Sequence, residues 1–322
     1  MQAARGIHST SYLIGPLSDA KTRFFAIVNP AAGGGRCGAL SQSALARVRS
    51  AISPRGAELE VVQTRRSGEA TELARAAYAK GFRNFLAVGG DGTSYEIVNG
   101  VFPESLTQGR ISLGFLPLGT GNSFLRDFTS EGVEHTIGAI AAARSRPCDV
   151  IRLRHADGEI YFINVLNLGF PSDVAELTNR RFKPLGEFGY ILAVFGRLAW
   201  LSFATMPHRV GAGEWDRRPF LFLAITNSKF TGGKMMIAPK ADPGSGKIEY
   251  VRWAPLGRLR LLWNFPRLFT GTHINHPLAS RVAVERIDFE LDAPVGAVVD
   301  GETMKIDIRS IEILPAALDV IV

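Results

Sequence analysis

The first half of the chain repeats one pattern: a short apolar stretch, a glycine-rich loop and then apolar residues at helical spacing. The apolar stretches span 24–28, 84–88 and 112–116, and the loops that follow them span 29–36, 89–93 and 117–122. Another apolar stretch, 59–64, lies between helical patterns at 40–52 and 70–78. Strands that alternate with helices predict a parallel sheet covered by helices. Because ligands of such sheets bind at the carboxyl ends of the strands, the three loops predict one shared binding site.

The loop after residue 88 places an aspartate among glycines, in Gly89-Gly90-Asp91-Gly92. Glycines let the backbone approach a bulky group, and the N–H groups that open the next helix, predicted over 94–101, can face anionic oxygens. Asp91 would repel a phosphate unless a cation lay between the two. The loop therefore indicates a site for a metal-bound nucleotide, and a purely structural strand-to-helix turn is the alternative.

The composition is that of a globular protein long enough for two domains, with 322 residues of which 46% are hydrophobic and 21% charged. A net charge of +7 favours anionic partners such as phosphates or acidic membrane surfaces. No arginine-rich block or aromatic-studded basic run favours nucleic acid, so we expect no nucleic-acid partner. Two cysteines without metal-ligand spacing suit a reducing compartment. Arg197 interrupts the longest apolar run, 188–206, which disfavours a membrane span.

The pattern changes near residue 147, where strands begin to follow one another. Asp157-Gly158 separates two apolar stretches and predicts a hairpin, and further strands are expected at 220–226, 247–252, 281–291, 297–299 and 306–314. Helical patterns occur at 188–206 and 256–269. We therefore expect a flexible leader at 1–22, a Rossmann-like nucleotide-binding α/β domain at 23–146, and a mainly antiparallel, β-rich substrate domain at 147–322. The last strand could pack back on the first domain.

Short motifs occur in a fixed order from about residue 24 to the C-terminus. They are Asn29-Pro30 with its glycines, Gly89-Gly90-Asp91-Gly92-Thr93 with Glu96 and Asn99-Gly100, 117–122, 164–169, Gly232-Gly233 with Pro239, and Asp300-Gly301-Glu302. Together they make the chain resemble the diacylglycerol kinase catalytic family, which includes bacterial soluble lipid kinases and the sphingosine and ceramide kinases. The loop around Asp91, taken alone, is also similar to those of NAD kinases and phosphofructokinases.

The resemblance implies a two-domain lipid kinase fold that binds ATP and Mg²⁺ in the cleft between the domains. Asp300 would be the general base on the lipid hydroxyl, with Glu302 beside it, and Asp91 would act through Mg²⁺, directly or through water. The residues that the family pattern places around the nucleotide are Asn29, Pro30, Ala31, Ala32, Gly33, Thr64, Gly90, Asp91, Gly92, Thr93, Ser94, Tyr95, Glu96 and Thr120.

A repeated tripeptide and two departures from the family pattern bear on this assignment. Asp157-Gly158-Glu159 repeats the tripeptide at 300–302, both copies could be plain hairpin turns, and only their order among the motifs selects Asp300. Ser123 stands where many bacterial members carry an aspartate of a hydrogen-bond network around a magnesium-linked water, and Asp149 could supply part of that network. Ser245 replaces the expected aspartate of a regulatory metal site, so we assign no metal ligand there.

The acceptor is expected to be a lipid alcohol. Sphingosine kinases carry an acidic residue two positions after the one that matches Asp173, where it pairs with the sphingoid amine, and Ala175 stands there in this chain. This favours diacylglycerol, which would give phosphatidic acid, with a sphingoid base or ceramide as the alternative. Two other hypotheses are an NAD kinase-like phosphotransferase and a non-catalytic lipid-binding protein with a degenerate nucleotide site.

Two segments suggest how a lipid would be reached. The stretch 185–206 could line a slot for acyl chains or form a core helix. The stretch 256–269 mixes arginines with aromatic and aliphatic residues, so it could dock on an anionic membrane or form an ordinary surface helix. We expect a cytoplasmic protein that associates peripherally with membranes. The sequence is also compatible with a homodimer.

Overall fold

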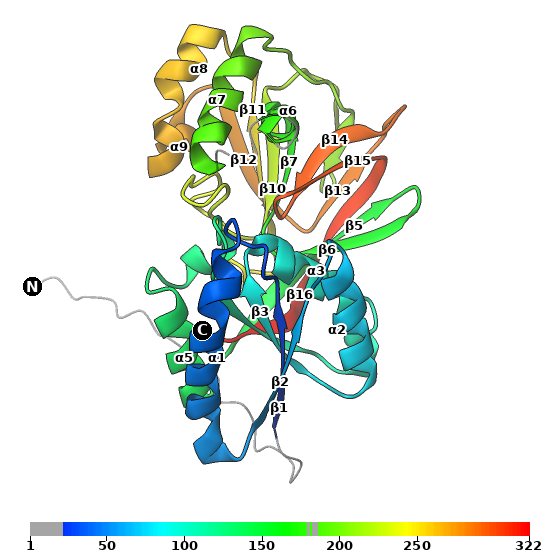
Figure 1. Cartoon of the computed structure of the whole chain (residues 1–322). Coiled ribbons are helices and arrows are strands. Elements are labelled where there is room, and N and C mark those ends of the chain that lie inside the picture. Colours follow the sequence, from blue (N-terminus) through cyan, green and yellow to red (C-terminus); the bar gives the residue numbers. More distant parts are fainter. Residues whose placement is uncertain (1–21, 179–180, 182–185) are drawn as a thin grey trace, which may run out of the picture.

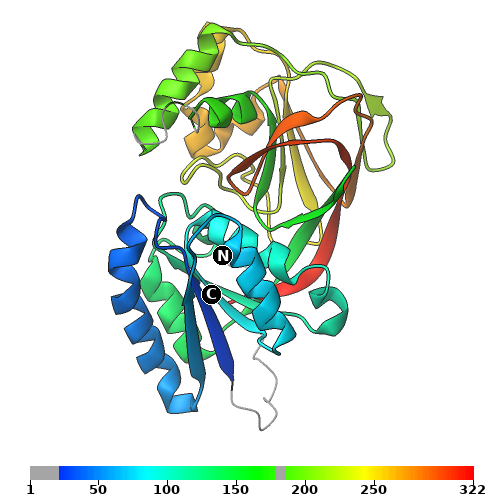
Figure 2. The same ribbon diagram turned by 45° about the vertical axis from the view of Figure 1, so that its right-hand side comes forward.

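The computed structural model describes residues 22–178, 181 and 186–322, which form two lobes. Figures 1 and 2 show the lobe with the first strands below and the lobe with the later strands above. The expected leader lies almost wholly outside the described residues, as does the start of the expected slot at 185. No helix in the described part of the chain is both long and apolar enough to cross a bilayer.

The lower lobe contains the predicted parallel sheet. Its strands are β1 (Arg23–Val28), β2 (Glu58–Gln63), β3 (Asn84–Gly89) and β4 (Ser112–Pro117), which lie in the order β2-β1-β3-β4 with parallel pairing. The helices are α1 (Arg36–Ile52), α2 (Glu69–Ala79), α3 (Asp91–Val101), the short α4 (Ser105–Gln108) and α5 (Val133–Ala142), with single 3₁₀ turns at η1 (Ser53–Arg55) and η2 (Phe124–Asp127). The expected doubly covered α/β fold is confirmed.

Alternation along β1 explains why helices cover both faces of this sheet. Successive side chains of a strand point to opposite faces. Phe25 and Ile27 pack in one core with apolar residues of α2 and α3. Phe24, Ala26 and Val28 pack in another core with residues of α1 and α5. A strand that is buried on both faces therefore has a continuous apolar sequence.

Two long strands connect the lobes. β5 (Arg146–His155) pairs with β16 (Ile308–Val320) along most of its length, with irregularities between Ile308 and Ser310 and between Leu314 and Leu318. The end of β16 also pairs in parallel with β4, where Asp319 lies opposite Ser112. In Figure 1 this strand, drawn in red, runs from the lower sheet into the upper lobe. The chain therefore returns to complete the first sheet with one of its latest strands.

The upper lobe is a sandwich of two sheets. An antiparallel sheet contains β7 (Val165–Gly169), β10 (Phe222–Thr226), β11 (Ile248–Trp253), β12 (Ala279–Val284), β14 (Val295–Val299) and β15 (Glu302–Ile306). The opposing layer extends the first sheet and contains β5, β16, β6 (Gly158–Phe162), β8 (His208–Val210), β9 (Trp215–Asp216) and β13 (Arg286–Phe289). Their inward side chains form one apolar core between the layers.

Four helices cover the outer face of the antiparallel sheet. They are α6 (Phe170–Leu177), α7 (Gly186–Ala199), α8 (Arg258–Asn264) and α9 (Arg267–Thr270), followed by the 3₁₀ turn η5 (Thr272–Asn275). Apolar residues of these helices pack on β10 and β11 in a separate core. Figures 1 and 2 show α7 and α8 next to each other at the outer end of the upper lobe.

Three expected elements are shortened or divided in the structure. The helix expected over 188–206 ends at Ala199, because Ala204 forms an antiparallel bridge with Phe220 and needs extended backbone. The helix expected over 256–269 is divided near Pro266, which cannot continue an α-helical hydrogen-bond ladder. The single strand expected over 281–291 is two strands, since β12 pairs with β11 and β13 pairs with β16 in the other layer.

Candidate active site

A polar cavity of about 430 Å³ lies at the carboxyl ends of β1 and β2 and at the start of α3. Eight of the residues expected around the nucleotide line this cavity together with Glu302 of the upper lobe. The cavity is also lined by residues between β2 and the start of α2, which sequence analysis did not identify. The expected residues are Asn29, Pro30, Ala31, Ala32, Thr64, Gly92, Thr93 and Glu96, and the additional ones are Arg65, Arg66, Ser67 and Ala70.

Backbone hydrogen bonds hold the loops of this cavity together. The N–H of Asn29 donates to the carbonyl of Val88 at 2.9 Å, and its side-chain oxygen accepts from the N–H of Ala31 at 3.1 Å. The N–H of Gly119 donates to the carbonyl of Gly89 at 2.7 Å. The three loops therefore meet at one edge because their strands are parallel neighbours.

A close backbone contact explains one glycine of these loops, and a side chain of the upper lobe lies close to another. A Cβ atom on Gly119 would lie 2.5 Å from the Cα atom of Gly90, so the two glycine loops can touch only without side chains. A Cβ atom on Gly92 would lie 2.6 Å from Oε1 of Glu302. The carboxylate of Glu302, on β15, therefore packs directly against the first turn of α3 and joins the two lobes at this cavity.

Glu96 holds the loop that sequence analysis missed. Its two carboxylate oxygens accept the N–H groups of Gly68 and Ala70, each at 2.9 Å, at the start of α2. A carboxylate at a helix N-terminus is stabilised by the helix dipole. Glu96 therefore shapes the cavity wall through the backbone. The hydroxyl of Thr93, in contrast, is buried and has no hydrogen-bond partner among the described residues, as expected for a group that meets a ligand.

The remaining expected nucleotide residues lie around this cavity without lining it. Gly33 has a left-handed φ of 63° and its carbonyl accepts from Nε of Arg36 at 3.0 Å. The Ser94 hydroxyl donates to the carbonyl of Asp91 at 2.8 Å, and Tyr95 packs against the sandwich core. Thr120 is exposed. Gly90 forms the loop contact described above.

A second cavity, of about 300 Å³, extends from the centre of the molecule into the upper lobe. Asp91 and Asp300 lie in its wall with Ser123, and they are the only charged residues among the described residues that line it. The other walls come from α6, α7, α8, α9 and the neighbouring strands, with apolar residues that include Phe170, Ala175, Val194, Leu221, Phe222, Met235, Ile237, Leu261, Phe265, Leu268 and Val298.

Asp300 occupies a strained, buried position in the turn between β14 and β15. Its φ is 47°, in the left-handed region that L residues other than glycine rarely adopt. Its carboxylate accepts the N–H groups of Ile163 at 3.1 Å, Asn164 at 3.1 Å and Val165 at 2.9 Å. Burial raises the pKa of Asp300 to about 7, and the charge of Asp91 adds to the rise, although the three hydrogen bonds oppose it. A carboxyl with a pKa near neutrality suits a general base.

Asp91 faces the same cavity from the lower lobe. Its Oδ2 atom accepts the N–H of Ser123 at 2.8 Å. Burial raises the pKa of Asp91 more than the hydrogen bonds from Ser123 and the attraction of Arg126 lower it. Two carboxylates in one cavity repel each other, and a divalent cation would relieve that repulsion. No group of three or more potential ligand residues occurs in the described part of the chain, so such a cation would need phosphate or water oxygens as well.

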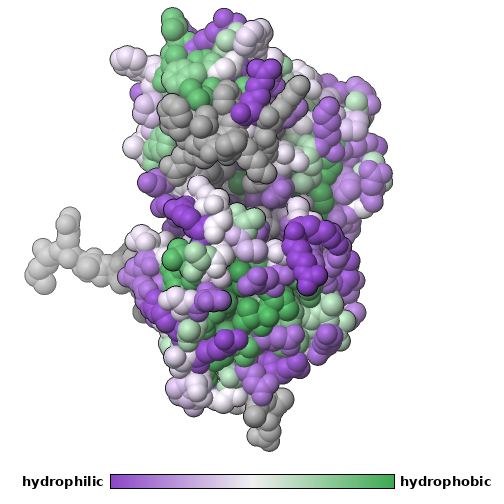
Figure 3. All heavy atoms as spheres, viewed as in Figure 1, coloured by the Kyte–Doolittle hydropathy of each residue, from purple (hydrophilic) through white to green (hydrophobic). Residues whose placement is uncertain are grey.

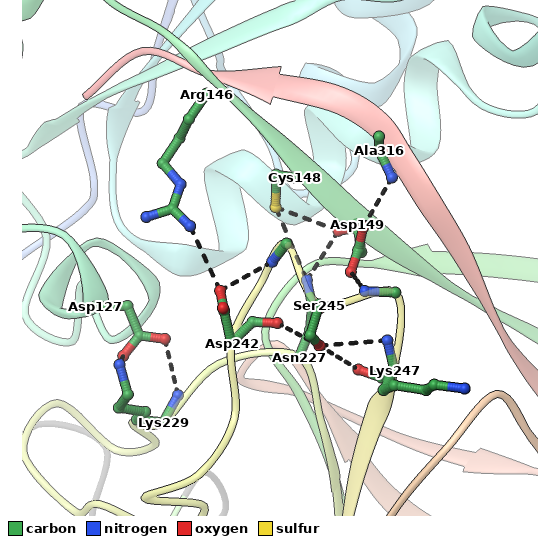
Figure 4. Close-up of polar contacts among 12 residues, drawn as sticks. Asp127, Arg146, Cys148, Asp149, Asn227, Lys229, Asp242, Ser245, Lys247 and Ala316 are labelled. Carbon is green, nitrogen blue, oxygen red and sulfur yellow. Dashed lines mark hydrogen bonds and ion pairs between the residues drawn. The ribbon is translucent and has the colours of Figure 1, made fainter. Parts of the chain in front are cut away.

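Ser123 connects the lobes next to Asp91. Its hydroxyl oxygen accepts the N–H of Gly233, on the loop after β10, at 2.8 Å. Ser123 is buried and brings no charge. The carboxylate of Asp149 accepts the N–H groups of Gly246 at 2.6 Å and Ala316 at 2.8 Å, and Asp149 lines neither cavity (Figure 4). Its expected part in a network around a magnesium-linked water stays a prediction.

Figure 4 also shows how the neighbouring loops of the upper lobe are held. The Ser245 hydroxyl donates to the carbonyl of Asp242 at 2.9 Å and thereby closes a turn. Asp127, which sequence analysis did not single out, accepts the N–H of Lys229 at 2.9 Å. Burial raises the pKa of Asp127 to about 6. These contacts fix the segment between β10 and β11 against the lower lobe.

The second Asp-Gly-Glu tripeptide has a different environment. His155 pairs with Gly158 at the end of the β5–β6 hairpin, and Asp157 is exposed at its tip. Glu159 forms an ion pair with Arg154 at 3.0 Å. Asp157 lines neither cavity, whereas Asp300 lies between the lobes, so the geometry favours Asp300 as the reacting carboxylate.

Comparisons with known proteins agree with this arrangement. The family described as "Diacylglycerol kinase catalytic domain" matches residues 23–153, and the "YegS C-terminal NAD kinase beta sandwich-like domain" matches residues 164–322. A protein of Pseudomonas fluorescens named "Probable lipid kinase YegS-like" is 30% identical over 85% of this chain and 89% of its own length. A protein of Mycobacterium tuberculosis named "Diacylglycerol kinase" is 28% identical over 92% of this chain and 94% of its own.

Solved structures show the same fold. A crystal structure of a diacylglycerol kinase from Bacillus anthracis superposes with a TM-score of 0.66 at 18% identity and covers 93% of this chain and 96% of the other. A second crystal structure from the same organism reaches a TM-score of 0.72 at 19% identity, with the same two shares covered. The chain therefore belongs to the diacylglycerol kinase and YegS-like lipid kinase family, and it is an ATP-dependent phosphotransferase with an alcohol group as acceptor.

Proposed function

We propose that the protein transfers the γ-phosphate of Mg·ATP to diacylglycerol and forms phosphatidic acid. The observation that supports this best is the composition of the second cavity, which is lined mainly by apolar side chains and, among the described residues, carries charge only at Asp91 and Asp300. A lipid with an uncharged headgroup and two acyl chains matches this lining, because the acyl chains would contact the apolar side chains and the hydroxyl would lie next to Asp300.

Among the described residues, no acidic side chain other than Asp91 and Asp300 lines this cavity and could pair with a sphingoid amine. Ala175 lines the wall at the position where an acid would be expected. Asp173, two residues earlier, is paired with Arg197 at 3.2 Å and does not line the cavity. The amide oxygen of Asn167 is buried without a hydrogen-bond partner among the described residues, and it lines the cavity, where a hydroxyl could donate to it. These features favour a neutral alcohol over an amine.

In the proposed reaction, the Asp300 carboxylate accepts the proton of the lipid hydroxyl as its oxygen attacks the γ-phosphorus of ATP. The bond from the γ-phosphorus to the bridging oxygen breaks, and ADP leaves. Thr93, Gly92 and the first turn of α3 would hold the phosphates in the polar cavity through N–H and hydroxyl donors. When bound, Mg²⁺ supplies charge neutralisation for the phosphates, and Asp91 would hold it directly or through water.

One turn would align the two substrates. Asp300 lines the apolar cavity and Glu302, two residues later, lines the polar cavity. Because the β14–β15 turn contributes to both, movement of one carboxylate would move the other. The turn would thereby fix the hydroxyl in line with the phosphate, which is the main requirement of phosphoryl transfer.

Incubation of the full chain with labelled ATP and Mg²⁺ tests the acceptor. Diacylglycerol, sphingosine, ceramide and NAD are offered separately, and labelled phosphatidic acid is expected as the main product. Faster labelling of sphingosine or ceramide would replace diacylglycerol as the acceptor, and labelling of NAD would favour the NAD kinase-like hypothesis. No labelled product with any acceptor, despite ATP binding, would support a non-catalytic lipid-binding protein.

A further inference from the structure

The outer end of the upper lobe exposes large apolar side chains on two neighbouring helices. On α8, Leu259 is 83% exposed and Trp263 is 81% exposed. Just after α7, Trp200 is 78% exposed. Figure 3 shows apolar residues at the upper left, over α7 and α8 in the view of Figure 1. Side chains of this size are rarely left in water together without a partner.

Arginines surround these apolar residues. Arg258 and Arg260 lie on α8 and Arg267 opens α9, and none of the three forms an ion pair with another described residue. The stretch 254–284 contains no aspartate or glutamate. We call Trp200, Leu259 and Trp263, together with these three arginines, the aromatic–arginine surface. This surface therefore carries a higher density of positive charge than the chain as a whole.

The same short helices form a wall of the apolar cavity with their other side. Leu261 of α8, Phe265 between the two helices and Leu268 of α9 line the cavity, while Leu259 and Trp263 face solvent. The spacing of two residues between Leu259 and Leu261 places them on different sides of a helix. One layer of helix thus separates the cavity from the exposed surface.

We propose that the aromatic–arginine surface docks on anionic bilayers and thereby brings the wall of the acyl cavity to the membrane. This inference rests on the proposed lipid acceptor, which resides in a bilayer. Tryptophan is favoured at membrane interfaces because its ring is apolar and its N–H is polar. Arginines beside it attract acidic headgroups. The surface therefore has both properties of an interfacial helix, and the acid-free segment matches an anionic partner in charge.

Vesicle co-sedimentation of the full chain tests the docking without ATP. Vesicles of phosphatidylcholine alone are compared with vesicles that also contain phosphatidylglycerol. We expect binding to rise with phosphatidylglycerol and to fall with added salt, because salt screens exposed charges. Each basic residue near an anionic surface contributes about 1 kcal/mol, so R258E/R260E should lower the partition coefficient by about thirty-fold or more.

Matched variants separate the effect of this surface on vesicle binding from the effect of a change in net charge. R49E/R75E makes the same change in net charge on exposed residues of α1 and α2 and should lower binding far less. L259S/W263S should lower binding on the order of tenfold, because two exposed apolar side chains no longer insert. Equal binding of R258E/R260E and the parent, or equal loss in R49E/R75E, would overturn the proposal. Unchanged vesicle binding with capture of another protein by this surface would indicate a protein partner instead.

A kinase assay distinguishes this proposal from the proposed function. R258E/R260E should lose activity on diacylglycerol in anionic vesicles but retain it on a water-soluble, short-chain diacylglycerol. Equal loss on both substrates would contradict a docking role. If the parent binds vesicles through this surface and phosphorylates neither substrate, the acceptor assignment fails while the docking surface stands.

Discussion

The two cavities to which the β14–β15 turn contributes differ in what forms their walls. The polar cavity is made by loops at the ends of parallel strands, and much of its lining is backbone and small side chains. The apolar cavity is made by side chains of helices that pack on an antiparallel sheet. A cavity formed by backbone requires glycines at particular positions. The shape of a cavity formed by side chains changes when one apolar residue replaces another. The polar cavity is therefore conspicuous in the sequence, and the apolar cavity is not.

Substitution of Asp300 is the strongest test of the division between the cavities. Asp300→Asn should lower kcat by about 1,000-fold, the effect typical of losing a general base, because an amide cannot accept the hydroxyl proton. ATP binding should remain, since Asp300 lines the apolar cavity alone. Turnover is measured with labelled ATP, and nucleotide affinity by calorimetry.

Asp157→Asn provides the control for that substitution, because it alters the same tripeptide at an exposed hairpin tip. It should leave kcat unchanged. A dead Asp157→Asn variant with an active Asp300→Asn variant would reverse the assignment. Thermal unfolding of both variants would show whether loss of the three hydrogen bonds to Asp300 has disturbed the fold.

The pH dependence of kcat/KM should show whether Asp300, in the apolar cavity, is the base. Asp300 accepts a proton only as a carboxylate, and burial raises its pKa to about 7. The parent should therefore lose kcat/KM as pH falls below about 7, by roughly tenfold per pH unit, and reach a plateau above it. A profile that stays flat down to the ordinary pKa of an aspartate would show that Asp300 is not the titrating base.

Gly119→Ala should affect the polar cavity first. Its Cβ atom would lie 2.5 Å from the Cα atom of Gly90, so the two loops must separate. Such overpacking typically costs about 1–3 kcal/mol, and we expect KM for ATP to rise about tenfold with a smaller change in KM for the lipid. Gly138→Ala in α5 is the control, because nothing lies within 4 Å of its added Cβ. An equal rise in both KM values would contradict separate cavities.

Ala175→Asp should change the preference between lipid substrates, and we expect the smallest effect of the four predictions here. The new carboxylate would face the apolar cavity, where an ammonium group could pair with it and diacylglycerol could not. We expect the ratio of kcat/KM for sphingosine over diacylglycerol to rise by several-fold, up to about tenfold. Competition between the two lipids in one assay measures the ratio, and Ala175→Ser, which adds no charge, should leave it nearly unchanged.

Sequence analysis identified the parallel sheet and most of the residues that line the polar cavity, because glycine loops and apolar strands are local signals. It missed Arg65, Arg66 and Ser67, which have no motif and enter the cavity because Glu96 holds their loop. The division of 281–291 at Glu285 was also missed, because both halves are strand-like and only their partners differ. The hydrogen-bond partners of Asp149 are also remote in sequence, so no local pattern shows them.

The pairing of β16 with β4 also constrains how the chain acquires its fold during synthesis. Leu318 and Val320 belong to the core that α2 and α3 share with the first strands. The ribosome delivers β1 to β4 long before these residues, so the edge of β4 must wait for a strand that arrives far later in the chain. Contacts between such distant segments slow folding and expose strand edges to other chains. Nascent chains that stall before β16 should therefore be vulnerable to aggregation and proteolysis at the lower lobe.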